Sequence, residues 1–254
     1  MSCLTSMIEP LRAANEITGQ EIFSWQLISE NGARIVLADI EADGVAKAAA
    51  KLGGGAVGIT VDMSDVDQIN QLFDRIEAEI GPVEILVNNA GISRPAPFLE
   101  ASIEDFKDVL DVNLTGVFAA TQRAAKAMVA HGIEGSIVNM SSVNAQMAIP
   151  TIASYCASKG GVMQVTKAAA VALAPYNIRV NAVGPGSIDT AMMAAVNADE
   201  AAMKVVMSRT PLKRVGSPRE IGDTVAFLAS KKASYITGET IYVDGGRLGM
   251  NYTC

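Results

Sequence analysis

The chain has 254 residues, a formal net charge of −7 and 50% hydrophobic residues. This length fits one large domain or two small ones, with ample apolar material for a core. The acidic surplus argues against nucleic acid and anionic membranes as partners, because both bind cationic surfaces. The single histidine, His131, argues against a Ser-His-Asp hydrolase and against a histidine-ligated metal site.

The cysteines and the N-terminus indicate a cellular location. Cys3, Cys156 and Cys254 have no spacing typical of a metal site or of a disulfide framework, which favours a reducing cytoplasm. No stretch approaches the roughly 20 apolar residues of a membrane-spanning helix. Charged residues such as Glu9 and Arg12 interrupt any signal-peptide core. We therefore expect a cytoplasmic protein with no metal and no membrane partner.

Short β-branched runs alternate with helix-length segments from residue 32 onwards. Most of the runs are continuously apolar, which is typical of parallel strands covered on both faces. Ser64-Asp65, Ser102 and Ser217 with Glu220 are helix-capping signals, whereas Gly53-Gly54-Gly55 indicates a turn after a helix. The alternation predicts one α/β domain over residues 1–254, with a doubly wound parallel sheet and helices on both of its faces. The expected strands are 34–39, 56–61, 84–88, 135–140, 178–183 and 240–243, and the expected helices are 42–51, 65–80, 102–130, 153–174, 191–207 and 218–229.

A tyrosine and a lysine lie four residues apart in the expected helix 153–174. At that spacing Tyr155 and Lys159 share one helix face, and a nearby ammonium lowers the pKa of a phenol toward the range of acid–base catalysis. Ser142 ends a strand and can donate a hydrogen bond to a substrate oxygen. Asn113 lies inside the helix 102–130, where a polar kink can hold a water molecule. Alone, the Tyr155–Lys159 pair is also compatible with a solvated helix face.

Six motifs in a fixed order make the pattern specific. Together they resemble the short-chain dehydrogenase/reductase family over about residues 32–248. The resemblance implies a Rossmann-type sheet of seven strands and an NAD(P)-dependent oxidoreductase that interconverts a secondary alcohol and a ketone by hydride transfer. The motifs are Asn88-Asn89-Ala90-Gly91, Asn113, Asn139-Met140-Ser141-Ser142, Tyr155-x-x-x-Lys159, Asn181-x-x-x-Pro185-Gly186 and Asp244-Gly245-Gly246.

The resemblance assigns catalytic roles to four residues. It implies that Tyr155 is the acid/base and that Lys159 lowers the pKa of the tyrosine and hydrogen-bonds the nicotinamide ribose. Ser142 would polarise the substrate carbonyl, and Asn113 would support a water in the proton path.

Further residues are expected to contact the dinucleotide. Asp39 ends a strand, and a carboxylate there can accept both ribose hydroxyls of NAD and repel the 2′-phosphate of NADP, so NAD is favoured. Neither Ala38 nor Ile40 supplies a cation for that phosphate, although Arg34 lies earlier on the strand. By the resemblance, the remaining cofactor contacts are Asp62 and Met63 at the adenine, Asn89, Ala90 and Gly91 beside the cofactor, and Pro185, Gly186, Ile188 and Thr190 at the nicotinamide.

The substrate side is predicted from composition and from position. Residues 187–216 are rich in Ala and Met and are expected to form a lid over the substrate, with Met192 in its wall. Asn144 and Gln146, just after Ser142, are candidates to face a small neutral alcohol or ketone. The resemblance also implies a homotetramer.

The first 31 residues depart from the family pattern. Members open with a strand and a Thr-Gly-x-x-x-Gly-x-Gly loop whose backbone approaches the pyrophosphate, whereas residues 1–31 contain only Gly19. Either Thr18-Gly19 is a remnant of that loop, or the segment has another origin. We favour the second account, because the segment resembles the amidotransferase-like domain of carnitine-type AraC-family regulators, which makes the chain a chimera.

The departure leads to an expectation about structure and one about function. The first strand and the glycine-rich loop are expected to be replaced or missing, with a helix over 5–18 and a strand over 23–28 as candidates to fill the gap. Without the glycines, dinucleotide affinity is expected to be weak. The alternative function is therefore an impaired or inactive relic with a structural or binding role.

Overall fold

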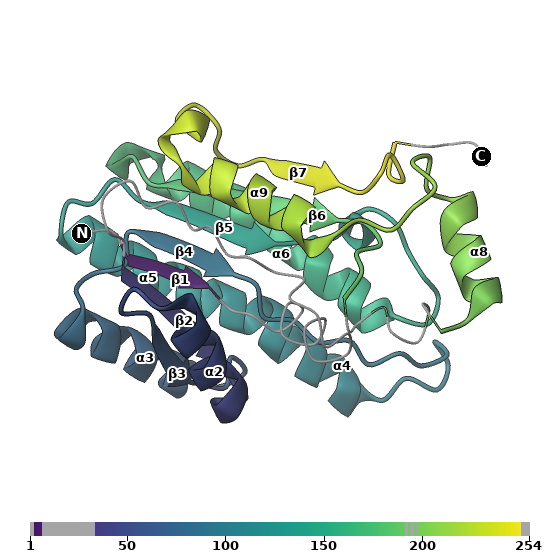
Figure 1. Ribbon diagram of the computed structural model, residues 1–254, viewed down its shortest axis with the longest axis horizontal. Coiled ribbons are helices and arrows are strands. Elements are labelled where there is room, and N and C mark those ends of the chain that lie inside the picture. The colour runs from purple at the N-terminus through teal and green to yellow at the C-terminus, as the bar shows by residue number, and fades with distance from the viewer. Residues whose placement is uncertain (1–2, 7–33, 191–192, 194–195, 197, 250–254) are drawn as a thin grey trace.

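Residues 3–6, 34–190, 193, 196 and 198–249 are described by a computed structural model, and they contain one seven-stranded sheet (Figure 1). All strand pairs are parallel, and the order is β3-β2-β1-β4-β5-β6-β7. From β1 the chain adds strands β2 and β3 on one side of the sheet and strands β4 to β7 on the other, so the doubly wound α/β sheet is confirmed. The strands are β1 (Cys3–Ser6), β2 (Arg34–Asp39), β3 (Val57–Thr60), β4 (Ile85–Asn88), β5 (Ser136–Met140), β6 (Arg179–Pro185) and β7 (Thr240–Val243).

Strand β1 fills the central place in the sheet. Leu4 is in register with Ile35 of β2 on one side and with Ile85 of β4 on the other. A first strand is therefore present, and it comes from residues 3–6 rather than from the expected 23–28. Because residues 5 and 6 belong to this strand, a helix cannot begin at residue 5. Residues 7–33, which include the rest of that helix and the segment 23–28, lie outside the described residues.

Helices cover both faces of the sheet, as predicted. Val36 of β2 packs in one cluster with Phe73 of α3 and Ala120 of α5, whereas the next residue, Leu37, packs with Val45 of α2 on the opposite face. Figure 1 shows α9 in front of β5 and β6, and α8 beyond the carboxyl ends of the strands. The helices are α2 (Ala42–Leu52), α3 (Val66–Glu79), α4 (Ile103–Leu110), α5 (Val117–Ala130), α6 (Ala153–Leu173), α8 (Glu200–Ser208) and α9 (Pro218–Ala229).

The predicted caps and turn are confirmed. The Asp65 side chain accepts hydrogen bonds from two backbone N–H groups of α3, and Ser102 accepts one from Asp105. Ser217 and Glu220 form a capping box at the start of α9. Gly53, Gly54 and Gly55 all have positive φ, which a turn after a helix requires. Of the helix expected over 191–207, α8 covers the second part from Glu200, and residues 191, 192, 194, 195 and 197 lie outside the described residues.

The expected helix 102–130 is interrupted in its middle. A π-helix, Asp111–Gly116, separates α4 from α5 and carries Asn113. Such short π-helical insertions in α-helices are frequent at functional sites. The polar kink predicted at Asn113 is thus confirmed.

We predict that Gly116→Ala destabilises the protein. A β-carbon at Gly116 would overlap the carbonyl oxygen of Met63, a backbone atom that cannot move without shifting the loop after β3. The expected loss is about 2 kcal/mol in the free energy of unfolding, measured by urea denaturation. Gly222→Ala on α9 is the control, because its β-carbon would meet no atom within 4 Å. It should leave stability unchanged or raise it by about 0.5 kcal/mol. Equal losses in the two variants would contradict the proposed contact.

Candidate active site

The candidate site lies where β5 ends and α6 passes beside it. Ser142 follows Met140, the last residue of β5, after a single intervening residue, and Tyr155 and Lys159 lie in the first two turns of α6. The Lys159 ammonium donates a hydrogen bond to the Met140 carbonyl at 2.8 Å, and the Ser141 hydroxyl donates one to the Lys159 carbonyl at 3.1 Å. These two bonds attach the turn of α6 that carries Lys159 to the carboxyl end of β5, the edge at which parallel sheets bind ligands.

The tyrosine, the lysine and the serine are brought together as predicted. The Lys159 Nζ lies 5.5 Å from the centre of the Tyr155 ring. The Ser142 side chain lies close enough to the Tyr155 phenol to act on its pKa. Lys159 and Ser142 are buried, and Tyr155 is half-buried. A substrate oxygen that reached the phenol would therefore also reach the serine hydroxyl.

The electrostatics of the pair differ from the expectation. Burial raises the pKa of the Tyr155 phenol above its ordinary value, and the nearby Ser142 side chain only partly opposes this rise. Burial lowers the pKa of Lys159 from 10.5 to about 8. The pKa of the phenol is raised because removing the phenolate from water costs more than its surroundings return. Lys159 is not among the causes of this shift, so its predicted lowering of the Tyr155 pKa stays a prediction.

Asn113 joins the π-helix to two other parts of the site. Its Oδ1 accepts a hydrogen bond from the Ile92 N–H at 2.8 Å, and its Nδ2 donates to the Ile92 carbonyl at 2.9 Å and to the Ser158 hydroxyl at 3.1 Å. Ser158 donates in turn to the Tyr155 carbonyl at 2.8 Å. Asn113 thereby positions both the loop after β4 and the turn that carries the tyrosine. Its predicted role in holding a proton-path water stays a prediction.

A buried polar ladder runs across the sheet behind the site. Asn88 and Asn139 are register partners in β4 and β5, and Asn88 Nδ2 donates to Asn139 Oδ1 at 2.8 Å. Asn88 Nδ2 also donates to the Thr121 hydroxyl of α5, and Asn139 Nδ2 donates to the Thr166 hydroxyl of α6, each at 3.0 Å. Sequence reasoning missed Thr121, Thr166 and Ser158. The available signal was a hydroxyl residue on the otherwise apolar inner face of a helix.

The residues expected to hold the adenosine half of a dinucleotide lie at strand ends. Asp39, buried at the end of β2, accepts a hydrogen bond from the Glu41 N–H on Oδ1 at 2.8 Å. Asp62 accepts from both the N–H and the hydroxyl of Ser64, each at 2.8 Å. Met63 is buried against Gly116. A carboxylate fixed at the end of β2 fits the recognition of a ribose diol.

The residues expected around the nicotinamide also fit a closely approaching ligand. Asn89, Ala90 and Gly91 follow β4, and a β-carbon at Gly91 would be 3.4 Å from the Lys159 Nζ, so a glycine keeps the space beside the ammonium open. Pro185 ends β6, and a β-carbon at Gly186 would lie 2.7 Å from the Asp244 Cα, which only a glycine avoids. Ile188 is buried, and Thr190 Oγ1 lies 3.4 Å from the Ile188 carbonyl. The segment expected to face the pyrophosphate, 7–33, lies outside the described residues.

The expected substrate residues are placed less uniformly. Gln146 Nε2 donates to the Tyr242 hydroxyl of β7 at 2.8 Å, and Asn144 Oδ1 is buried without a hydrogen-bond partner. Met192 lies outside the described residues. Within the described ranges no group of three or more His, Cys, Asp or Glu side chains is arranged to hold a metal ion. No helix in the same ranges has the length and apolar character needed to cross a membrane.

We predict that Lys159→Met stabilises the protein at neutral pH and abolishes its activity. Keeping the ammonium charged in the folded state costs about 3 kcal/mol below pH 8, because the pKa there is about 8 against 10.5 in the unfolded chain. Loss of the Met140 hydrogen bond offsets about 1 kcal/mol of this gain, which leaves about 2 kcal/mol. The unfolded wild type keeps its proton up to pH 10.5, whereas the folded form releases it above about 8.

The advantage of Lys159→Met should therefore shrink as the pH rises from 8 to 10.5. Urea denaturation at pH 7, 9 and 10 measures this change. Lys126→Met, which replaces an exposed lysine of α5, is the control and should show no comparable trend. A Lys159→Met advantage that does not change with pH would contradict the assigned burial of the charge.

Comparison with known proteins agrees with this geometry. Residues 25–247 match the family described as Enoyl-(Acyl carrier protein) reductase. A cis-4-hydroxycyclohexanecarboxylate dehydrogenase of Sinomonas cyclohexanicum is 40% identical over 224 residues, which are 87% of this chain and 89% of the relative. A 3-oxoacyl-[acyl-carrier-protein] reductase of Thermotoga maritima is 40% identical over 223 residues, 87% of this chain and 89% of the relative.

Solved structures show the same likeness. A gluconate 5-dehydrogenase from Burkholderia cenocepacia, in complex with NADP and tartrate, superposes with a TM-score of 0.86 at 33% identity, covering 98% of this chain and 96% of that one. A 4-hydroxyisoleucine dehydrogenase complexed with NADH gives a TM-score of 0.87 at 29% identity, covering 99% and 100%. None of these comparisons supports the resemblance of residues 1–31 to a transcription regulator. With its fold, its Tyr155–Lys159 pair and these relatives, the chain belongs to the short-chain dehydrogenase/reductase family.

Proposed function

We propose that the protein is an NAD(H)-dependent oxidoreductase that interconverts a secondary alcohol and a ketone on a small hydroxy or keto substrate. The observation that carries this proposal is the Lys159 ammonium 5.5 Å from the centre of the Tyr155 ring, with the Ser142 side chain close enough to the phenol to lower its pKa. Family membership supports the reaction class, and the relatives are dehydrogenases and reductases by name.

The chain's own groups handle the proton. A bound nicotinamide supplies or accepts the hydride, and the fixed carboxylate of Asp39 together with the side-chain-free Gly91 and Gly186 suits such a ligand. In ketone reduction, the Tyr155 hydroxyl donates its proton to the substrate oxygen while Ser142 donates a hydrogen bond to the same oxygen. The raised pKa of Tyr155 keeps the phenol protonated at neutral pH, which suits this direction. In alcohol oxidation, the phenolate accepts the proton, and the Lys159 charge favours that form.

NAD is proposed as the cofactor in preference to NADP. The Asp39 carboxylate is fixed by the Glu41 N–H at the end of β2, where it would repel a 2′-phosphate. Solved relatives contain NADP in two cases and NADH in one, so the preference for NAD rests on Asp39 alone.

The alternative is an impaired or inactive relic with a structural or binding role. It is motivated by residues 1–31, where Gly19 is the only glycine and the phosphate-binding pattern of the family is absent. A chimeric origin of this segment belongs to the same proposal. Sequencing the gene and its upstream region from genomic DNA would test that origin.

A homotetramer in the cytoplasm, built from a single domain per chain, completes the proposal. Large apolar side chains are exposed on three helices that the family resemblance places at subunit contacts. Covering them in an assembly would remove apolar surface from water. They are Ile103 and Phe106 of α4, Phe118 of α5 and Val171 of α6.

We predict that Tyr155→Phe abolishes turnover and leaves the fold intact. The substitution removes the only proton-donating atom of the side chain, and the expected loss is at least about a thousandfold in kcat. NADH absorbance with a panel of secondary alcohols and ketones measures turnover, and circular dichroism checks the fold. Tyr176→Phe, an exposed tyrosine after α6, is the matched control and should retain full activity. Turnover that survives in Tyr155→Phe would contradict the assigned mechanism.

We predict that Asp39→Ala shifts the cofactor preference toward NADP. Removing the carboxylate removes both the ribose acceptor and the repulsion of the 2′-phosphate, so the ratio of NADH to NADPH affinity should fall by about tenfold or more. Fluorescence titration of both cofactors measures the ratio, with Asp43→Ala on the exposed start of α2 as the control. An unchanged ratio would contradict the role of Asp39. Micromolar NADH binding by the unaltered chain would contradict the impaired alternative.

A further inference from the structure

Ser158 is a buried hydroxyl residue of α6 to which the proposed function assigns no role. It is 0% exposed and lies three residues after Tyr155. Its Oγ donates a hydrogen bond to the Tyr155 carbonyl at 2.8 Å and accepts one from Asn113 Nδ2 at 3.1 Å. A serine often bonds a carbonyl of the preceding turn of its own helix. The bond from Asn113 sets Ser158 apart, because it comes from another element, the π-helix.

The chemistry of the partners fixes the direction of each bond. The Ile92 N–H can only donate and the Ile92 carbonyl can only accept, so together they determine which end of the Asn113 amide is Oδ1 and which is Nδ2. Nδ2 then donates its second proton to Ser158, whose hydroxyl donates to the Tyr155 carbonyl. Because Asn113 is also fully buried, removal of the Ser158 hydroxyl would take that acceptor from a buried N–H group.

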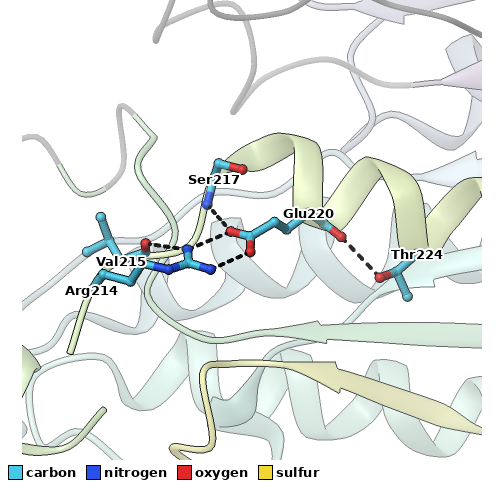
Figure 2. A network of polar contacts seen from close by, with 5 residues as sticks. All are labelled: Arg214, Val215, Ser217, Glu220 and Thr224. Carbon is cyan, nitrogen blue, oxygen red and sulfur yellow. Dashed lines mark hydrogen bonds and ion pairs between the residues drawn. The ribbon is translucent and has the colours of Figure 1, made fainter. Parts of the chain in front are cut away.

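The first turn of α6 has no side-chain cap. The residue before the helix is Ile152, whose side chain has no hydrogen-bonding group. By contrast, α9 begins with a complete cap, in which the Ser217 N–H donates to the Glu220 carboxylate at 2.7 Å and Arg214 donates two hydrogen bonds to the same carboxylate (Figure 2). A helix start without a cap tends to fray. Ser158 connects the uncapped start of α6 to the buried π-helix.

The turn that carries Lys159 is attached in a different way. The Lys159 ammonium donates to the Met140 carbonyl, and the Ser141 hydroxyl donates to the Lys159 carbonyl. Neither bond involves Ser158. Loss of the Ser158 hydroxyl should therefore loosen Tyr155 and leave Lys159 in place, so that proton donation changes and cofactor binding does not.

We propose that Ser158 is a positioning residue for the proton transfer: its hydroxyl connects the fixed Asn113 amide to the turn that carries Tyr155, and thereby holds the phenol where it can donate to the substrate oxygen. This inference rests on the proposed oxidoreductase function. Ser158 acts through the backbone of the tyrosine. A misplacement of the phenol by about 1 Å can cost about a hundredfold in rate, because proton transfer needs a closely aligned donor and acceptor.

The test compares two buried serines that form the same kind of bonds. Ser158→Ala removes the proposed link. Ser136→Ala, at the amino end of β5, is the matched control, because Ser136 is also buried, accepts from the Arg179 guanidinium at 3.2 Å and donates to the Leu228 carbonyl at 3.2 Å. The two variants should show similar shifts of the urea denaturation midpoint, since each loses one buried hydroxyl. The control should retain the kcat of the wild type.

Kinetics and hydrogen exchange measure the effect. In Ser158→Ala, kcat should fall by about tenfold or more while NADH affinity changes by less than about twofold, and the solvent deuterium isotope effect on kcat should rise because proton donation becomes slower. A general loss of folded protein would lower kcat without raising the isotope effect. Amide hydrogen exchange of residues 153–158, followed by mass spectrometry, should be faster in Ser158→Ala than in the wild type and in Ser136→Ala.

The positioning role would be overturned by wild-type kcat in Ser158→Ala, by a loss of kcat without a change in the isotope effect, or by unchanged exchange at residues 153–158. Should Ser158→Ala fail to fold, Ser158→Cys keeps the size with a thiol that donates only weakly, and wild-type kcat and exchange in that variant would also overturn the proposal. A wild type that turns over no ketone, together with faster exchange in Ser158→Ala, would contradict the oxidoreductase function and leave the hydrogen-bonded link standing. Wild-type turnover with equal kcat and equal exchange in Ser158→Ala and Ser136→Ala would do the reverse.

Discussion

The candidate site depends on a lysine ammonium held inside the protein by one backbone carbonyl. The Lys159 ammonium donates a hydrogen bond to the Met140 carbonyl at the end of β5, and the side chain is buried away from water. Burying the Lys159 charge costs free energy, and the lowered pKa of Lys159 reflects this cost. Favourable interactions in the surrounding structure must supply that energy. The energy is available because α6 is attached to the sheet along its length, so that Lys159 cannot swing out to solvent without separating packed elements.

Buried hydrogen bonds provide much of this attachment. Asn113 links the π-helix to Ser158 and to the loop after β4, and the Asn88–Asn139 pair joins neighbouring strands and the helices behind them. Buried amides and hydroxyls are costly unless they are paired, so each bond in such a network restricts the positions of the others. The network therefore sets where Tyr155 and Ser142 meet. Arg247 is the contrasting case, a buried arginine whose Nε has no hydrogen-bond partner among the described residues.

The sequence predicted the strands behind the site well, but it did not predict the electrostatics of the side chains in the site. The strands from β2 to β7 were predicted to within a few residues, because buried parallel strands are continuous apolar runs between helices with clear caps. Tyr155, Lys159 and Ser142 were found because they are close in the sequence or belong to ordered motifs. The raised pKa of Tyr155 was not anticipated, because spacing shows that a cation is near but does not show how deeply the phenol is buried. The burial of Arg247 was missed for the same reason, since only its surroundings distinguish this side chain from an exposed arginine.

The sequence by itself determined the α/β class and the order of the strands' apolar runs, because periodicity encodes these, and its family resemblance supplied the proposed proton-handling groups. The tertiary structure decided which segment fills the centre of the sheet, since the pairing of Leu4 with both β2 and β4 is a contact between residues far apart in the chain. It also decided which charges are desolvated. Desolvation depends on what packs around a group from every side, and Lys159 and Arg247 owe their altered pKa values to neighbours that no local pattern reveals.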